Sequence, residues 1–182
     1  MSRIRNICTP LAITIVLSIS FVSRVSASYV LPYPSYMPGN KLYGVSRIAD
    51  RMKSYWYWGD IGKVQYHMNL ADKYLVEAKT LLEYKQYLLG IDALARSNSE
   101  FLHISGNLQS AKQNGKDVSM LSTAVVAESE VHHDTLAGLR MDVPEIFVWE
   151  PEKSEASMLK LHELLNQAIT IRQQEASSAM HL

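Results

Sequence analysis

The segment 128–134, with the sequence ESEVHHD, has residue types and a spacing that could do chemistry. On a helix, Glu128 and His132 lie one turn apart on the same face. A carboxylate and an imidazole placed in this way can both bind a metal ion, and a catalytic zinc usually takes three protein ligands. Three histidines on other predicted helices could supply the third ligand: His67, His103 and His162. The sequence favours a Glu–His pair partly buried between helices. The alternative is a metal site at Glu128 and His132.

No local motif for catalysis accompanies this pair. The sequence lacks the HExxH zinc motif, the GxSxG nucleophile turn, the phosphate-binding loop and the dinucleotide-binding fingerprint. The single cysteine, Cys8, precedes the apolar stretch near the N-terminus, so the chain after that stretch has no thiol for catalysis or zinc binding. We therefore expect a protein that is not an enzyme and holds no cofactor.

The first 27 residues have the three parts of a secretory signal peptide. Arg3 and Arg5 give a basic start, residues 11–22 form an apolar stretch, and Val25 and Ala27 are small residues at the positions that a signal peptidase reads. Cleavage is expected after Ala27, which would place the protein outside the cytoplasm, either secreted, in the periplasm or at the cell surface. The alternative is an uncleaved segment that tethers the protein to the membrane.

The net charge after residue 27 is slightly negative. The first 27 residues contain three of the 18 basic residues and none of the 18 acidic ones, so the rest of the chain carries a net charge of −3. A chain of this charge without a basic stripe is not expected to bind nucleic acid. The remaining 155 or so residues are enough for one domain with a hydrophobic core.

Apolar residues recur at three- and four-residue steps over most of the chain, which predicts an all-α fold. A bundle is expected over 42–142, and a C-terminal helix over 152–176 packs on it, followed by a frayed tail at 177–182. Short turns between consecutive helices favour an up-and-down antiparallel bundle of four to five helices. Leu75 and Leu165 should be buried in it. The first helix should turn the following residues to the core: Leu42, Val45, Ala49, Met52 and Trp56.

Two proline-rich segments interrupt the helical pattern. Residues 28–41 contain three prolines and three tyrosines, which predicts an extended strap across the helices. Residues 143–151 carry two more prolines, and Ile146 to Trp149 could be extended. A lone strand has no partner to pair with, so this connector is expected to be a second strap.

Four consecutive aromatic residues end the first predicted helix: Tyr55, Trp56, Tyr57 and Trp58. Four adjacent side chains cannot all face one core. Packing in the core and at the hinge is the simpler expectation, and a contact with a partner protein is the alternative.

Part of the chain resembles a bacterial family, the domain of unknown function 5667. The resemblance covers residues 31–108 and is carried by the entry LPYP at 31–34, the segment MPGNKLY at 37–43 and the helix LADKYLVEA at 70–78. It implies a helical module that is exported or tethered to the membrane, with no assigned activity and no catalytic residues.

These features lead to two functional hypotheses. The first is a non-catalytic binding or structural module of the bacterial cell envelope with an unknown protein partner, which meets the membrane only through an uncleaved N-terminal segment. The alternative is a metal-binding or metal-sensing extracytoplasmic protein that uses Glu128 and His132.

Overall fold

The structure, a computed structural model, describes residues 29–33, 36–38, 40–152 and 155–182, and it is mostly helical. The predicted signal peptide, residues 1–27, lies outside the described residues. Among the helices of the described part, none is both long and apolar enough to cross a membrane.

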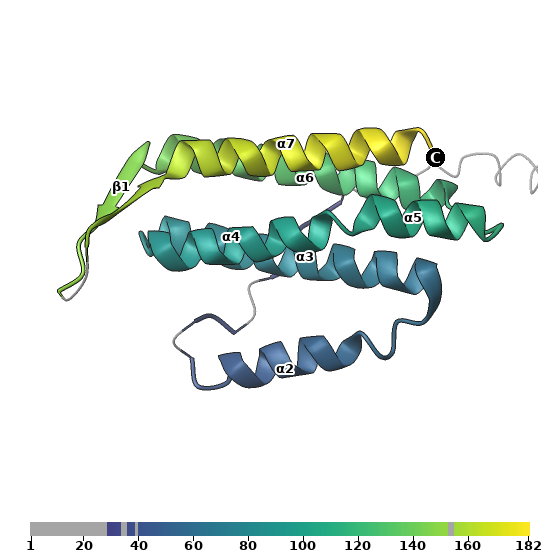
Figure 1. Cartoon of the computed structure of the whole chain (residues 1–182), viewed down its shortest axis with the longest axis horizontal. Coiled ribbons are helices and arrows are strands. Elements are labelled where there is room, and N and C mark those ends of the chain that lie inside the picture. Colours follow the sequence, from purple (N-terminus) through teal and green to yellow (C-terminus); the bar gives the residue numbers. More distant parts are fainter. Residues whose placement is uncertain (1–28, 34–35, 39, 153–154) are drawn as a thin grey trace, which may run out of the picture.

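Five helices form the main body: α3 (Gly59–Glu83), α4 (Tyr87–Phe101), α5 (Ile104–Gln113), α6 (Ser119–Asp142) and α7 (Leu161–Met180). Helix α3 packs along α4 and α5, and α6 packs along α7. The two groups face each other, chiefly through α3 with α6 and α4 with α7 (Figure 1). The prediction of an all-α bundle is therefore confirmed at the level of fold class.

The core consists of two apolar clusters at opposite ends of the bundle. Leu75, Leu94 and Leu165 belong to one cluster, while Val64, Phe101 and Leu108 belong to the other. Leu75 and Leu165 are fully buried, as predicted. Between the two clusters, the same helices contribute polar side chains to the interior, and these form the candidate site described below.

Two helices, α4 and α5, cover residues 87–113. The chain makes a tight turn at Leu102 and His103, which separates α4 from α5. In the first turn of α5, the Ser105 amide nitrogen donates a hydrogen bond to Glu175 Oε2 at 3.0 Å. Phe101 and Ile104, three residues apart, both lie in the core while Leu102 is exposed, so the apolar periodicity continues across the turn and does not reveal it.

A β-hairpin replaces the predicted second strap. Strand β1 (Ile146–Trp149) pairs antiparallel with β2 (Ser157–Lys160), and the hairpin extends beyond the end of the bundle (Figure 1). The prediction that 146–149 has no partner is wrong, and so is the predicted helix start at 152. The spacing of Met158 from Leu161 and Leu165 mimics a helix. In the structure Met158 lies on β2 and is exposed. The segment is a strand because β1 and β2 satisfy each other's backbone hydrogen-bonding groups.

The predicted fraying of residues 177–182 is also wrong. Helix α7 continues to Met180, and Ala179 is only 1% exposed because it packs in the same apolar cluster as Leu108. An alanine this close to the end of the chain gives a weak periodic signal, although it fills the core at this end of the bundle.

Helix α2 (Tyr43–Lys53) lies outside the main body and faces the opposite way from the prediction. The residues expected in the core are exposed, with Val45 at 60%, Met52 at 53% and Trp56 at 73% exposure, whereas Asp50 is only 3% exposed. The physical reason is that α3 presents polar groups to α2. The helix therefore turns its polar face inward and its apolar face to solvent.

Candidate functional site

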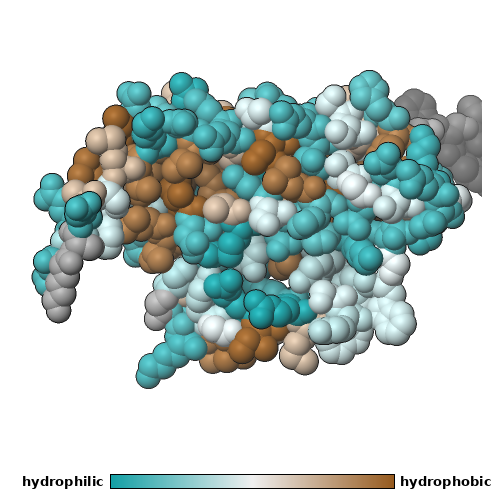
Figure 2. All heavy atoms as spheres, in the orientation of Figure 1, coloured by the Kyte–Doolittle hydropathy of each residue, from teal (hydrophilic) through white to brown (hydrophobic). Residues whose placement is uncertain are grey.

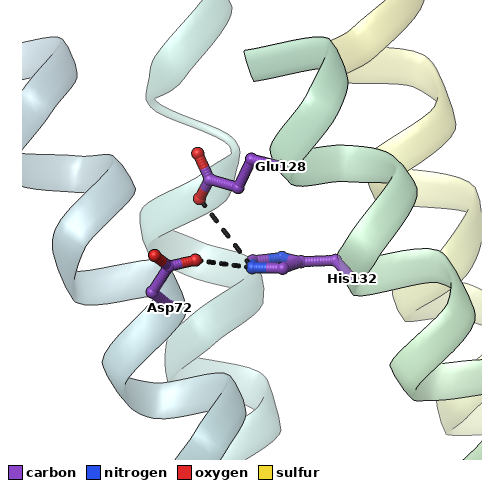
Figure 3. A group of neighbouring side chains, drawn as sticks. All are labelled: Asp72, Glu128 and His132. Atoms are coloured by element: carbon purple, nitrogen blue, oxygen red, sulfur yellow. Dashed lines mark hydrogen bonds and ion pairs between the residues drawn. The ribbon is translucent and has the colours of Figure 1, made fainter. Parts of the chain in front are cut away.

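The polar layer between the two apolar clusters contains the predicted pair Glu128 and His132. Both side chains lie on α6 and are fully buried. Asp72 on α3 points toward both of them, as Figure 3 shows. The structure thus brings together the two predicted residues and adds a third, Asp72, which the sequence analysis did not count among the candidate ligands.

His132 is held as a neutral ring by its two partners. Its Nε2 lies 2.7 Å from Asp72 Oδ1, and Arg172 Nε donates toward Nδ1 at 3.4 Å. Because Nδ1 accepts from a guanidinium, Nε2 carries the proton and donates it to Asp72. Burial lowers the pKa of His132, which also favours the neutral ring.

Glu128 is buried without compensation. Its Oε1 lies 3.8 Å from His132 Nε2, too far for a hydrogen bond, and neither carboxyl oxygen has a hydrogen-bond partner among the described residues. Burial, and then the nearby negative charge of Asp72, raises the pKa of Glu128 to about 9. Glu128 is therefore a neutral carboxylic acid at neutral pH.

Arg172 on α7 supplies the positive charge of this layer. Its guanidinium is fully buried, donates to Asn98 Oδ1 and, at 2.7 Å, to Ser97 Oγ, and lies 4.8 Å from the centre of the Phe101 ring. Burial lowers its pKa to about 10, so the group stays charged at neutral pH. Arg172 and Asp72 lie on either side of His132. When Glu128 is protonated, the positive charge of Arg172 neutralises the negative charge of Asp72.

Tyr29 closes the layer from the N-terminal side. Its hydroxyl donates to Asp72 Oδ2. Burial raises the pKa of Tyr29, so the phenol remains protonated. Both oxygens of Asp72 thus accept hydrogen bonds, one from Tyr29 and one from His132.

The fit of a divalent cation can be judged from these contacts. Asp72, Glu128 and His132 each offer one ligand atom, and the three atoms lie within 4.8 Å of one another. Three protein ligands are enough for a catalytic zinc. However, a ligating Nε2 needs its lone pair, and here it carries the proton because Nδ1 faces Arg172. A divalent cation in place of the Glu128 proton would also leave a net buried charge of about +1. These residues are therefore better suited to hold a proton on Glu128 than to bind a divalent cation.

The three histidines that sequence analysis considered as further ligands lie elsewhere. His67 Nδ1 is 2.8 Å from Glu100, the His103 ring stacks beside His67 with centres 4.9 Å apart, and His162 Nε2 is 3.0 Å from the Val143 carbonyl oxygen. Asp72 is the ligand-type residue that sequence reasoning missed. Its position next to the buried Ala71, one turn before Leu75 and Val76, was the available signal that it borders the core.

The second predicted site, the aromatic run at 55–58, lies next to the outward face of α2. Tyr55, Trp56 and Trp58 are 78%, 73% and 84% exposed. Tyr57 is half-buried and packs against Tyr66, with ring centres 5.6 Å apart. Three of the four aromatic side chains therefore extend the exposed apolar surface of α2, and one anchors the turn before α3.

The contacts that hold α2 to the bundle are polar. Tyr43 Oη donates to Glu77 Oε1 at 2.7 Å, and Tyr66 Oη donates to the Asp50 carbonyl oxygen at 3.2 Å. Lys73 donates to Ser46 Oγ at 2.9 Å and pairs with Asp50. A cavity of about 200 Å³ with mostly charged and polar walls lies between α2 and the body. The inward face of α2 is thus satisfied by charge and hydrogen bonds, which leaves its apolar face free.

Comparison with known proteins returns no match: no protein family model, curated protein or solved structure is similar to this chain.

Proposed function

We propose that the protein is a non-catalytic binding module whose working surface is the outward face of α2 together with the aromatic residues that follow it. The observation that carries this proposal is the orientation of α2. A surface helix normally turns its apolar face to the core, whereas α2 exposes Ile48 at 65% and buries Asp50. A contiguous exposed apolar surface of this kind marks an interaction site.

The burial of the polar layer supports a non-catalytic role. Glu128 and His132 are both 0% exposed, so no described surface brings a substrate to them. The hydrogen bonds of His132 with Asp72 on α3, and of Arg172 on α7 with Ser97 on α4, link the two halves of the bundle. We propose that this layer is a structural element of the module.

The finer architecture and the location also belong to this proposal. Consecutive helices pack side by side, α3 with α4 and α6 with α7, which supports an up-and-down antiparallel order. Leu31 and Met37 pack against the apolar cluster of Leu75, which supports a strap over part of 28–41. Export by a cleaved signal peptide, a place in a bacterial envelope and membership of the domain 5667 family rest on the sequence patterns given above.

A photo-crosslinking experiment tests the proposed surface. A benzophenone side chain at position 48 in the full chain, expressed in cells, should crosslink strongly to a protein or lipid partner. The matched control is the same group at position 141, because Met141 is also an exposed apolar residue, at 88%, but lies on α6. Equal crosslinking at the two positions would contradict the proposal.

A metal-binding or metal-sensing function is the second candidate. The proximity of the three ligand atoms of Asp72, Glu128 and His132 favours it, and the proton on His132 Nε2 and the charge of Arg172 oppose it. Elemental analysis of the protein purified without chelators separates the candidates. A stoichiometric metal that is lost in the Asp72→Asn variant would establish this second function.

A further inference from the structure

The outward surface of α2 combines apolar and basic residues in a way that identifies its partner. Four apolar side chains on one face are between 49% and 65% exposed: Leu42, Val45, Ile48 and Met52. Brown side chains gather along the outer edge of the molecule over α2 in Figure 2. Tyr55, Trp56 and Trp58 follow directly.

Basic residues border this apolar face. Lys41, Arg47, Arg51 and Lys53 are exposed, and the only acidic residue in 29–59, Asp50, is buried and paired with Lys73. Because successive residues of a helix are about 100° apart, Arg51 and Lys53 fall on opposite sides of the face formed by Val45, Ile48 and Met52. The exposed charged residues of 41–53 are therefore all basic.

The part of the chain that follows, residues 60–182, has the opposite net charge. Residues 60–182 contain 11 basic and 17 acidic residues, a net charge of −6, whereas residues 29–59 carry four basic residues and one acidic residue. The protein therefore has one cationic, apolar face on an acidic body. An anionic surface attracts this face and repels the others, which fixes the orientation of binding.

These features distinguish lipid from the other occupants of an apolar helix face. A helix with a polar face rich in Lys and Arg, an opposite apolar face and terminal Trp and Tyr residues is typical of helices that lie in the plane of a membrane surface. A second copy of the chain would bring two cationic α2 helices together, and like charges directly opposed at an interface are unfavourable.

We infer that α2 and the aromatic residues after it dock the protein on an anionic lipid surface, with the apolar face of α2 at the level of the headgroups and the bundle facing water. This inference rests on the proposed function and names its partner. Each exposed basic residue near an anionic membrane adds to the attraction, and the exposed tryptophans enter the interfacial region.

Quenching of tryptophan fluorescence tests this docking directly. The chain has three tryptophans, and a Trp149→Phe background leaves only Trp56 and Trp58, both next to α2. The full chain is mixed with vesicles of phosphatidylcholine, with or without phosphatidylglycerol, that contain brominated phospholipid. We expect strong quenching with the anionic vesicles and at least tenfold weaker binding to the zwitterionic ones.

A pair of charge-reversal variants shows which face binds. Replacing Lys41, Arg47 and Arg51 by Glu should weaken binding to anionic vesicles at least tenfold. The matched control replaces Lys85, Arg140 and Lys160 by Glu, which changes the net charge equally at exposed positions on the body. Both variants keep the same N-terminal segment, so a contribution from residues 1–27 is equal in the two.

The other outcomes have definite meanings. Absence of quenching, or an equal loss of binding in both variants, would overturn the inference. Strong crosslinking at position 48 to a protein, without quenching by lipid, would overturn it while the proposed function stands. Concentration-dependent dimers that Ile48→Gln disperses would identify a second copy as the occupant and overturn it as well. Failure of both crosslinking and quenching would contradict the proposed function itself.

Discussion

At the scale of single residues, Glu128 is the buried side chain with the least compensation. Both of its oxygens lack a hydrogen-bond partner among the described residues, and it lies close to the charge of Asp72. A charged carboxylate there would cost several kcal/mol. The protein reduces this cost by keeping a proton on Glu128, which makes folding depend on pH.

The first prediction follows from the pKa of Glu128, about 9 in the folded protein against an ordinary 4.5. The folded state binds a proton that the unfolded state releases, so this contribution to stability is complete below pH 4.5 and is lost as the pH rises to about 9. The Glu128→Gln variant has no such loss. Its free energy of unfolding in urea should exceed that of the wild type by about 4 kcal/mol at pH 7.5, three pH units above the unfolded pKa, and by nearly nothing at pH 4.

The control for this prediction is Glu130→Gln, because Glu130 is an exposed carboxylate on the same helix. It should leave the pH dependence unchanged. If Glu128→Gln and the wild type lost stability in parallel between pH 4.5 and 9, Glu128 would not be the group that holds the proton.

The second prediction concerns Arg172. The Arg172→Met variant leaves Asp72 without a positive charge in the core, so it should lower the free energy of unfolding by about 3–5 kcal/mol. The double variant Asp72→Asn/Arg172→Met removes both charges and should lose clearly less than the sum of the two single variants. Additive losses in chemical denaturation would mean that the two charges do not compensate each other.

Sequence patterns predicted part of this cluster. The helical spacing correctly grouped Glu128 with His132 on one face of α6. Asp72 was missed because a helical pattern identifies a face but does not say which residue of another helix meets it. That information depends on packing, which aligns α3 with α6.

At the scale of elements, α2 shows that amphipathic periodicity predicts a helix but does not predict which of its faces turns toward the rest of the protein. The same spacing that places Val45, Ile48 and Met52 on one side fits a core-facing helix or a partner-facing one. The polar partners on α3 decide between them, because Lys73 and Glu77 pair with Asp50 and Tyr43. The hairpin at 146–160 was missed for a similar reason, since its second strand had a helical spacing.

The third prediction compares one residue of α2 with one of the core. Ile48→Gln replaces a side chain that is 65% exposed, so it should change the free energy of unfolding by less than about 0.5 kcal/mol. Leu75→Ala removes a fully buried side chain and should cost about 2–5 kcal/mol. Urea denaturation measures both. A loss above about 2 kcal/mol for Ile48→Gln would mean that this face of α2 packs on the protein.

At the scale of the whole molecule, the arrangement separates stability from binding. The bundle supplies a core in two apolar clusters joined by a polar layer, and α2 lies beside it with a surface that contributes little to that core. Charge is separated in the same way, since the side of α2 is basic and the body is acidic. The helical class of the fold followed from sequence periodicity. This division of roles did not, because it depends on which side of α2 meets α3.

The most direct measurement of the central claim uses one nitroxide spin label at position 48. The label is attached to Ile48→Cys in a Cys8→Ser background, which removes the only native cysteine. Without lipid, the label should be mobile and accessible to a water-soluble relaxation agent. With phosphatidylglycerol-containing vesicles, it should lose that access and gain access to dissolved oxygen, while the same label at Met141 stays in water. A label at 48 that is shielded without lipid, or that remains in water with anionic vesicles, would contradict the outward, membrane-docking role of α2.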